Sequence, residues 1–135
     1  MADTMHLSVI SYEGELFSED VSFVKVFSKE GELGIYPEHT TLVCAIEDTD
    51  VVYDFKGDHL HSFYVSSGLI SITNNRFVIM TDQMIFYDGL DDKVETKKLK
   101  DFKEKYAKEK QYTKKMDYQK LIKQSEAKLR VIKHH

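Results

Sequence analysis

Two histidines, His59 and His61, have the residue types and spacing that most readily suggest chemistry. Residues two apart share one face of a strand, so both imidazoles could bind one metal ion, with His39 as the nearest third ligand by type. Zinc sites usually add cysteine or carboxylate ligands at recognisable spacings, and this sequence has no cysteine or paired carboxylate at such a spacing from the two histidines. The pattern favours exposed polar histidines, and we predict no metal site.

The serines and the single cysteine likewise show no pattern typical of a catalytic nucleophile. Ser66-Ser67-Gly68 lacks the flanking glycines of a nucleophile elbow, and no His and Asp partners can be assigned to it from spacing. Cys44 lies in the apolar run 41–46, which predicts a buried strand and an inert core thiol. We therefore predict a chain that is not an enzyme and has no cofactor.

The composition fits one compact domain, or one domain with a small appendage. The chain has 135 residues, of which 41% are hydrophobic, so it can bury a core without disulfide bonds. Its beginning is too polar for a signal peptide, and no apolar run approaches the roughly 20 residues that cross a bilayer. We expect a soluble intracellular protein that reaches a membrane only through partners.

Charge divides the chain into two opposed parts. Residues 91–135 carry 15 basic and 8 acidic side chains, a net charge of +7, which leaves −11 for residues 1–90. Such asymmetry predicts two segments with different partners. The basic part has a single arginine and the strands show no RNA-binding aromatic pattern, so we predict no nucleic-acid partner.

Residues 6 to about 85 form short β-rich runs separated by Gly, Asn, Asp and Ser, which predicts an antiparallel β-sandwich or barrel. The expected strands are 6–11, 21–28, 41–46, 51–55, 59–65, 67–73 and 76–82. Asn74-Asn75 predicts a hairpin turn because asparagine tolerates positive φ. Alternation places three pairs on shared faces: Leu7 with Val9, Val24 with Val26, and Leu69 with Ile72 across an imperfect register near Gly68.

After Asp88-Gly89 the chain is rich in Lys, Glu and Ala without further glycine or proline, which predicts a helical hairpin. Helices are expected over about 90–112 and 117–132, with Asp91 and Asp92 near the first N-terminus and Asp117 capping the second. The predicted apolar stripes are Leu99, Phe102 and Tyr106 on the first helix, and Tyr118, Leu121, Ile122, Ser125, Leu129 and Ile132 on the second. We predict two domains, a β-sandwich at 1–87 and a regulatory hairpin at 88–135.

One segment, Gly31-Glu32-Leu33-Gly34-Ile35-Tyr36-Pro37-Glu38-His39-Thr40-Thr41-Leu42, combines the only proline with two of the six glycines. The glycines permit unusual backbone angles and Pro37 fixes its own φ, so this segment predicts a rigid bend around a short strand. It resembles the hallmark GELGIYPxHxPL of the epsilon subunit of bacterial rotary ATP synthases. The resemblance extends to His6-Leu7-Ser8-Val9-Ile10-Ser11 as an opening strand, Glu15-Leu16-Phe17 as the next turn, and Leu129-Arg130-Val131-Ile132 in a closing helix.

This resemblance implies a non-catalytic subunit of the central stalk of a proton-translocating complex, peripheral to the cytoplasmic face of the bacterial plasma membrane. The implied partners are the gamma shaft subunit, the ring of membrane c-subunits and the alpha and beta subunits of the catalytic hexamer. The implied contacts are Glu30, Gly31 and Glu32 with the ring loops, and His39, Thr40, Thr41 and Leu42 with the shaft. Asp88, Gly89 and Leu90 would form the hinge before the helices.

In this family the two helices fold against the sandwich or extend into the hexamer, where they inhibit ATP hydrolysis. The implied inhibitory positions are Lys103, Lys110, Lys114, Leu121, Lys123 and Arg130. Some relatives bind ATP through an [IL]DxxRA motif. Leu90 and Asp91 match its start, but Val94 and Glu95 stand at its last two positions, and the added negative charge disfavours phosphate.

A second hypothesis rests on composition alone. A free β-sandwich adaptor could use its basic helical hairpin to bind an acidic protein, with no rotor involved. The rotor hypothesis predicts a tight complex with a long helical shaft protein, whereas the adaptor hypothesis predicts that most of the chain migrates alone in native extracts.

Overall fold

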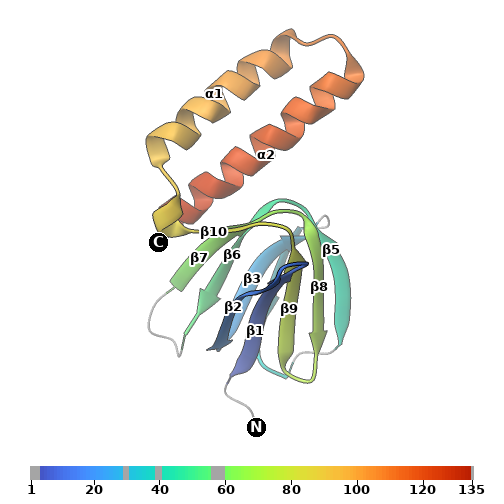
Figure 1. The fold of residues 1–135 in the computed structure, drawn as a ribbon, viewed down its shortest axis with the longest axis vertical. Helices are drawn as coiled ribbons and strands as arrows, with labels where there is room; N and C mark the ends of the chain where they lie inside the picture. Colours follow the sequence, from blue (N-terminus) through green and yellow to red (C-terminus); the bar gives the residue numbers. More distant parts are fainter. Residues whose placement is uncertain (1–3, 29–30, 39–40, 56–59, 135) are drawn as a thin grey trace.

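A computed structural model describes residues 4–28, 31–38, 41–55 and 60–134. Ten strands fold into a sandwich, and two helices form a hairpin at one end of it (Figure 1). This order confirms the predicted fold class. The strands are β1 Met5–Ser11, β2 Gly14–Val21, β3 Phe23–Ser28, β4 Gly31–Ile35, β5 Leu42–Ile46, β6 Thr49–Asp54, β7 Leu60–Val65, β8 Gly68–Thr73, β9 Arg76–Thr81 and β10 Met84–Phe86.

Hydrogen bonds connect the strands in the order β10-β7-β6-β3-β5-β8-β9-β1-β2, and β4 pairs with β3 beside this path. Strands β1 and β9 run parallel, with Leu7 opposite Phe77, and the other described pairs are antiparallel. The ends of the path meet through side chains, because the Phe17 ring of β2 lies 5.8 Å from the Phe86 ring of β10. The curled sheet thereby encloses a continuous core.

Alternation along the strands fills this core. Leu7 with Val9, and Val24 with Val26, are fully buried as predicted. The third predicted pair is wrong, because Leu69 points outward and Ile70 shares the inner face with Ile72. Other buried core residues include Val21, Ile35, Ile46, Val51, Phe63, Val65, Phe77 and Ile79.

Two turns depend on residues that accept positive φ. Asn74 and Asn75, at φ 50° and 61°, join β8 to β9 and confirm the predicted hairpin. Gly31 begins β4 at φ 125°, which favours glycine, and the predicted short strand is present. Gly34 is different, because its φ is not positive. A side chain there would approach the Phe23 ring at 3.3 Å, so close packing explains this glycine.

Several predicted strand boundaries are wrong. The run 21–28 is interrupted at Ser22, which separates the end of β2 at Val21 from the start of β3 at Phe23. Glu15-Leu16-Phe17, expected as a turn, lie within β2, and β10 was not predicted. The run 41–46 is not fully buried, because Val43 and Ala45 are exposed while Cys44 is half buried against the core.

A short 3₁₀ helix, η1 Tyr87–Gly89, leads into α1 Asp92–Lys108, and α2 spans Tyr112–His134. The Asp91 carboxylate caps α1 by accepting hydrogen bonds from the backbone N–H groups of Lys93 and Val94, at 2.9 and 3.3 Å. The second helix begins earlier than predicted. Asp117 therefore lies inside α2 instead of capping it, and the connection between the helices is 109–111.

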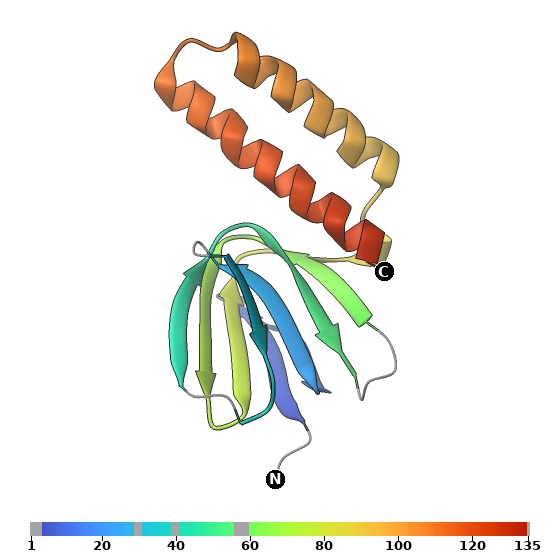
Figure 2. The same cartoon turned by 180° about the vertical axis from the view of Figure 1, so that it is seen from behind.

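The helical hairpin meets the sandwich through α2, which packs on β6 and β7, whereas α1 packs against α2 (Figure 2). Leu99, Phe102 and Tyr106 are half buried and form the predicted seam of α1. The predicted stripe of α2 is confirmed in part, since Ser125 is buried and its other members are half buried. The buried residues of α2 are Ser125, Ala127 and Val131, and the last two join Tyr64 of β7 in a small second core.

Candidate functional site

The surface between α2 and the sandwich is the first candidate site, and polar pairs dominate it. The chain from the end of β5 into β6 supplies three carboxylates, and one face of α2 supplies their partners. The pairs are Lys123 Nζ with Glu47 Oε2 at 3.3 Å, Gln124 Nε2 with Asp48 Oδ2 at 3.2 Å, and Arg130 Nε with Asp50 Oδ1 at 2.8 Å. We call these three pairs the docking contacts.

The Arg130–Asp50 pair is the most buried of the docking contacts. The Asp50 side chain is 1% exposed and that of Arg130 is 39% exposed. The Arg130 guanidinium also lies 5.4 Å from the centre of the Phe27 ring, a cation–π distance. Removing one partner of such a pair leaves an uncompensated buried charge, so Arg130 secures α2 more strongly than an exposed lysine would.

Tyr64 lies at the centre of the same surface. Burial and the nearby carboxylate of Asp48, which accepts its hydrogen bond, raise the pKa of the Tyr64 phenol well above its usual value. The phenol is therefore neutral at physiological pH and donates to Asp48. The Lys128 ammonium lies 5.1 Å from the Tyr64 ring centre, and the Ser62 hydroxyl donates to the Val131 carbonyl at 3.0 Å.

Substituting Arg130 with methionine is expected to weaken α2 docking by about 2 kcal/mol, below the roughly 3–5 kcal/mol of fully buried pairs because water reaches the guanidinium. Substituting Lys123 with methionine breaks a pair whose partners are both about half exposed, so its effect is expected at about 0–1 kcal/mol. Hydrogen exchange of the α2 amides measures both changes. Equal effects of the two substitutions would contradict the special role of Arg130.

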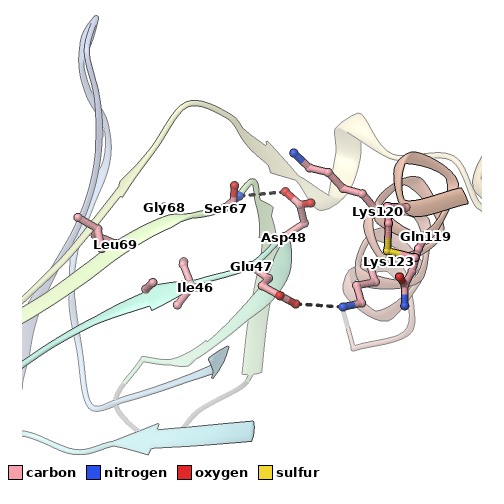
Figure 3. Close-up of a pocket in the computed structure, with 11 residues that line it drawn as sticks. Ile46, Glu47, Asp48, Ser67, Gly68, Leu69, Gln119, Lys120 and Lys123 are labelled. Carbon is pink, nitrogen blue, oxygen red and sulfur yellow. Dashed lines mark hydrogen bonds and ion pairs between the residues drawn. The ribbon is translucent and has the colours of Figure 1, made fainter. Parts of the chain in front are cut away.

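A cavity of about 560 Å³ lies between the docked α2 and the edge of the sandwich (Figure 3). Its sandwich side includes Ala45, Gly68 and Leu69, and its helical side includes Met116, Lys120 and Lys123. In Figure 3 Lys120 extends toward the sandwich, while Lys123 is paired with Glu47 and Ser67 with Asp48. The mixture of signs around the cavity does not indicate one charged ligand.

An outward apolar surface adjoins this cavity and is the second candidate site. Val43 of β5 is 64% exposed and Leu69 of β8 is 45% exposed. Cross-strand pairing places Leu69 beside Ala45 and Met80, and Met80 beside Ile10. We define the apolar face as Ile10, Tyr12, Val43, Ala45, Leu69 and Met80. Contiguous exposed apolar side chains commonly mark a surface that binds another protein.

Two of the three residues predicted to contact the ring, Gly31 and Glu32, lie at the helical end of the sandwich. Gly31 and Glu32 are exposed at the start of β4, and Glu32 lies 3.7 Å from Lys25. They follow Ser28, which shares a surface hollow with Arg130 of α2. Glu30 lies outside the described residues.

Two of the four predicted shaft residues, His39 and Thr40, lie outside the described residues. Thr41 is exposed, and Leu42 begins β5 and packs partly on the core. Glu38 lies at the end of the sandwich opposite the helices, because its backbone N–H donates to the Asn75 side chain in the β8–β9 turn. The next residue outward on β5, Val43, belongs to the apolar face.

The predicted hinge is exposed at Asp88 and Gly89, while Leu90 packs against the second core. The residues matching the nucleotide motif serve other purposes here. The Asp91 carboxylate is occupied by capping α1, and Glu95 is buried. We find no arrangement at these positions that favours phosphate.

The predicted inhibitory residues do not form one surface. Lys103, Lys110 and Lys114 are exposed on or near α1 and the start of α2. Leu121 is half buried, while Lys123 and Arg130 participate in the docking contacts. The docked hairpin thus exposes part of its basic charge and uses another part against the sandwich.

Of the histidines considered as metal ligands, His61 stacks on Tyr53 at 5.3 Å, and His59 lies outside the described residues. Within the described ranges, no group of three His, Cys, Asp or Glu side chains could hold a metal ion. No helix in the described part of the chain is long and apolar enough to span a membrane.

Sequence patterns missed the acidic side of the docking contacts. Glu47, Asp48 and Asp50 surround Thr49 at a strand junction, where a charged turn is the ordinary interpretation. The only available signal in the sequence was the opposite net charge of the two segments, since these carboxylates lie in the acidic segment and the helices form the basic one. That signal cannot identify which carboxylates are buried.

Comparison with known proteins is informative for both parts of the fold. The family model described as ATP synthase, Delta/Epsilon chain, beta-sandwich domain matches residues 4–86. A chain in the structure of the Euglena gracilis mitochondrial ATP synthase, which contains OSCP, F1 and the c-ring, is similar with a TM-score of 0.84. That match has 16% identity and covers 94% of this chain and 80% of the other.

A second similar structure is the central stalk and c-ring of the Tetrahymena thermophila mitochondrial ATP synthase. Its matching chain has a TM-score of 0.53 and 13% identity, covering 62% of this chain and 67% of that chain. At such identities these likenesses demonstrate a shared fold. The Euglena match includes the helical hairpin, since it covers more of this chain than the sandwich alone.

Proposed function

The chain belongs to the ATP synthase delta/epsilon family, a non-catalytic component of that complex, and from this membership we propose that it is a rotor subunit coupling the shaft to the membrane ring. Its partners are then the gamma shaft subunit, the c-subunit ring and, for the released helices, the alpha and beta subunits. The complex translocates protons and holds this subunit at the cytoplasmic face of a bacterial plasma membrane. Both similar structures come from mitochondria, so membrane fractionation of the source cells tests the compartment.

The apolar face is the observation that carries this proposal. A rotating shaft requires a subunit that stays bound under torque, and apolar burial supplies affinity that salt does not screen. The face begins on β5, directly after the predicted shaft residues Thr41 and Leu42. We assign the apolar face to the shaft subunit, and the turn at Gly31 and Glu32 to the polar loops of the ring.

Inhibition of ATP hydrolysis is the second part of the proposal. The contacts of α2 with the sandwich are small and largely polar, and the exposed lysines of the hairpin suit an acidic protein surface. An extended helix over 91–132 would reach about 60 Å, since each residue adds about 1.5 Å. Residues 1–87 would therefore couple the rotor, and 88–135 would regulate it around the hinge at Asp88, Gly89 and Leu90.

Placing a charge in the apolar face is expected to weaken shaft binding at least tenfold without unfolding the sandwich. In Leu69→Asp the carboxylate points outward in the free subunit but must be desolvated in the complex. Leu60→Asp is a matched control, because Leu60 is similarly exposed on β7 but lies outside the apolar face. Titration of the purified shaft subunit with each variant measures the dissociation constant.

Wild-type affinity of Leu69→Asp would contradict the assignment of the apolar face. The adaptor hypothesis makes a different prediction, in which the isolated chain does not bind the shaft subunit at all. Native separation of cell extracts adds an independent check, since the rotor subunit must migrate with the ATP synthase.

A further inference from the structure

Glu95 is the one fully buried residue of α1, and it is an acid. Its residue exposure is 5%, while the apolar seam residues Leu99, Phe102 and Tyr106 remain half exposed. Acidic side chains are rarely buried without a partner, because water solvates the charge better than protein does. The most buried position of α1 is therefore occupied by a charged side chain, which is costly to bury.

The surroundings of Glu95 compensate only part of this burial. Among the described residues, Glu95 Oε2 accepts no hydrogen bond, and the Lys98 ammonium lies 3.9 Å from Oε1. Glu95 also acts electrostatically on Tyr64 of β7, the residue whose phenol donates to Asp48. A buried carboxylate with one unsatisfied oxygen and a single long ion pair disfavours the closed arrangement.

The connectivity of the helices determines which movement relieves this cost. The docking contacts all belong to α2, whereas α1 packs against α2 through its half-exposed seam. Separation of α1 from α2 can therefore return Glu95 to water while Arg130, Gln124 and Lys123 keep their partners. Opening of the helical hairpin and release of α2 from the sandwich are thus separable steps.

We propose that Glu95 is a built-in destabiliser of the closed helical hairpin, so that α1 opens away from α2 before α2 leaves the sandwich. This inference deepens the regulatory part of the proposed function and rests on it for its biological meaning. The opening itself is a property of the isolated chain, and it does not require a shaft, a ring or a catalytic hexamer. It can therefore be tested separately from inhibition.

Hydrogen exchange of the full isolated chain tests the proposal. Glu95→Met keeps a side chain of similar length without charge, and Glu104→Met makes the same change at an exposed position of α1. Removing the unsatisfied buried carboxylate is expected to slow exchange of the amides at 96–108 roughly tenfold. Glu104→Met should change these rates less than about twofold. In either variant the exchange rates of the amides in the part of α2 that packs on β6 and β7 should change little.

Glu95→Gln provides a second variant that preserves the shape of the side chain and should slow exchange in the same direction. Unchanged or faster α1 exchange in both Glu95 variants would overturn the proposal, as would equal slowing by Glu104→Met. The exchange measurement uses the isolated chain, so its result does not depend on whether the chain inhibits ATP hydrolysis in the complex. Failure of the proposed function would therefore leave a positive exchange result intact, and the two failures are distinguishable.

Discussion

Ending the chain at Asp88 is expected to raise the ATP hydrolysis rate of the complete complex severalfold while leaving its assembly intact. The sandwich retains its main core and the apolar face, since all of these residues precede Asp88. The truncation removes both helices and with them the basic surface proposed to engage the catalytic hexamer. Hydrolysis should be measured on the purified complex at several salt concentrations, because exposed charge pairs weaken as salt increases.

A matched substitution separates inhibition from simple loss of mass. Asp50→Asn keeps both helices and the inhibitory position Arg130 but weakens α2 docking, so it should increase the time the hairpin spends released and lower the hydrolysis rate. The truncated and substituted complexes are thus expected to change in opposite directions. An unchanged rate after truncation would assign the hairpin a structural role, and a truncated chain absent from the purified complex would contradict the rotor assignment.

Gly68→Ala is expected to destabilise the sandwich by about 3–5 kcal/mol, a large part of the roughly 5–15 kcal/mol that holds a typical domain folded. A Cβ atom at this position would lie 1.9 Å from the Met80 carbonyl oxygen and 3.2 Å from the Thr81 Cα. Both atoms belong to the backbone of β9, so relief requires moving a paired strand. Urea unfolding followed by circular dichroism measures the change.

Gly89→Ala is the corresponding control. There the nearest atom to the new Cβ would be the Ile85 Cγ2 at 3.1 Å, the end of a side chain that can adjust. This substitution is expected to change stability by less than about 1 kcal/mol. Similar unfolding midpoints for the two alanine variants would show that β9 can move away from β8 without large loss of pairing energy.

Local rules predicted the sandwich well where one physical cause dominates. The Asn74-Asn75 turn was predictable because few other residues tolerate positive φ at two successive positions. Leu7 and Val9 followed from alternation, since β1 is covered on one face. Alternation also holds in β8, where Ile70 and Ile72 face inward and Leu69 faces outward, so the predicted pair of Leu69 with Ile72 failed because these residues are three positions apart.

The helices show what sequence alone could not determine. Asp117 is a good capping residue, yet nothing ends the helical propensity between Tyr112 and Asp117, so α2 begins earlier. The face of α2 that packs on the sandwich uses the small Ala127, which permits close approach, together with Val131, while larger apolar residues remain half exposed. Burial of Glu95 arises where α1 packs against α2, a tertiary contact that local patterning does not contain.

The parallel pairing of β1 with β9 has a consequence for how the protein is made. The ribosome completes β1 about seventy residues before Met80, yet β1 lies between β2 and β9 in the finished sheet. Such distant pairing closes slowly, so the emerging chain exposes the inward side chains of β1 until β9 appears. The sandwich therefore folds late during synthesis and almost in one step. The helical hairpin is synthesised after all the strands on which it docks.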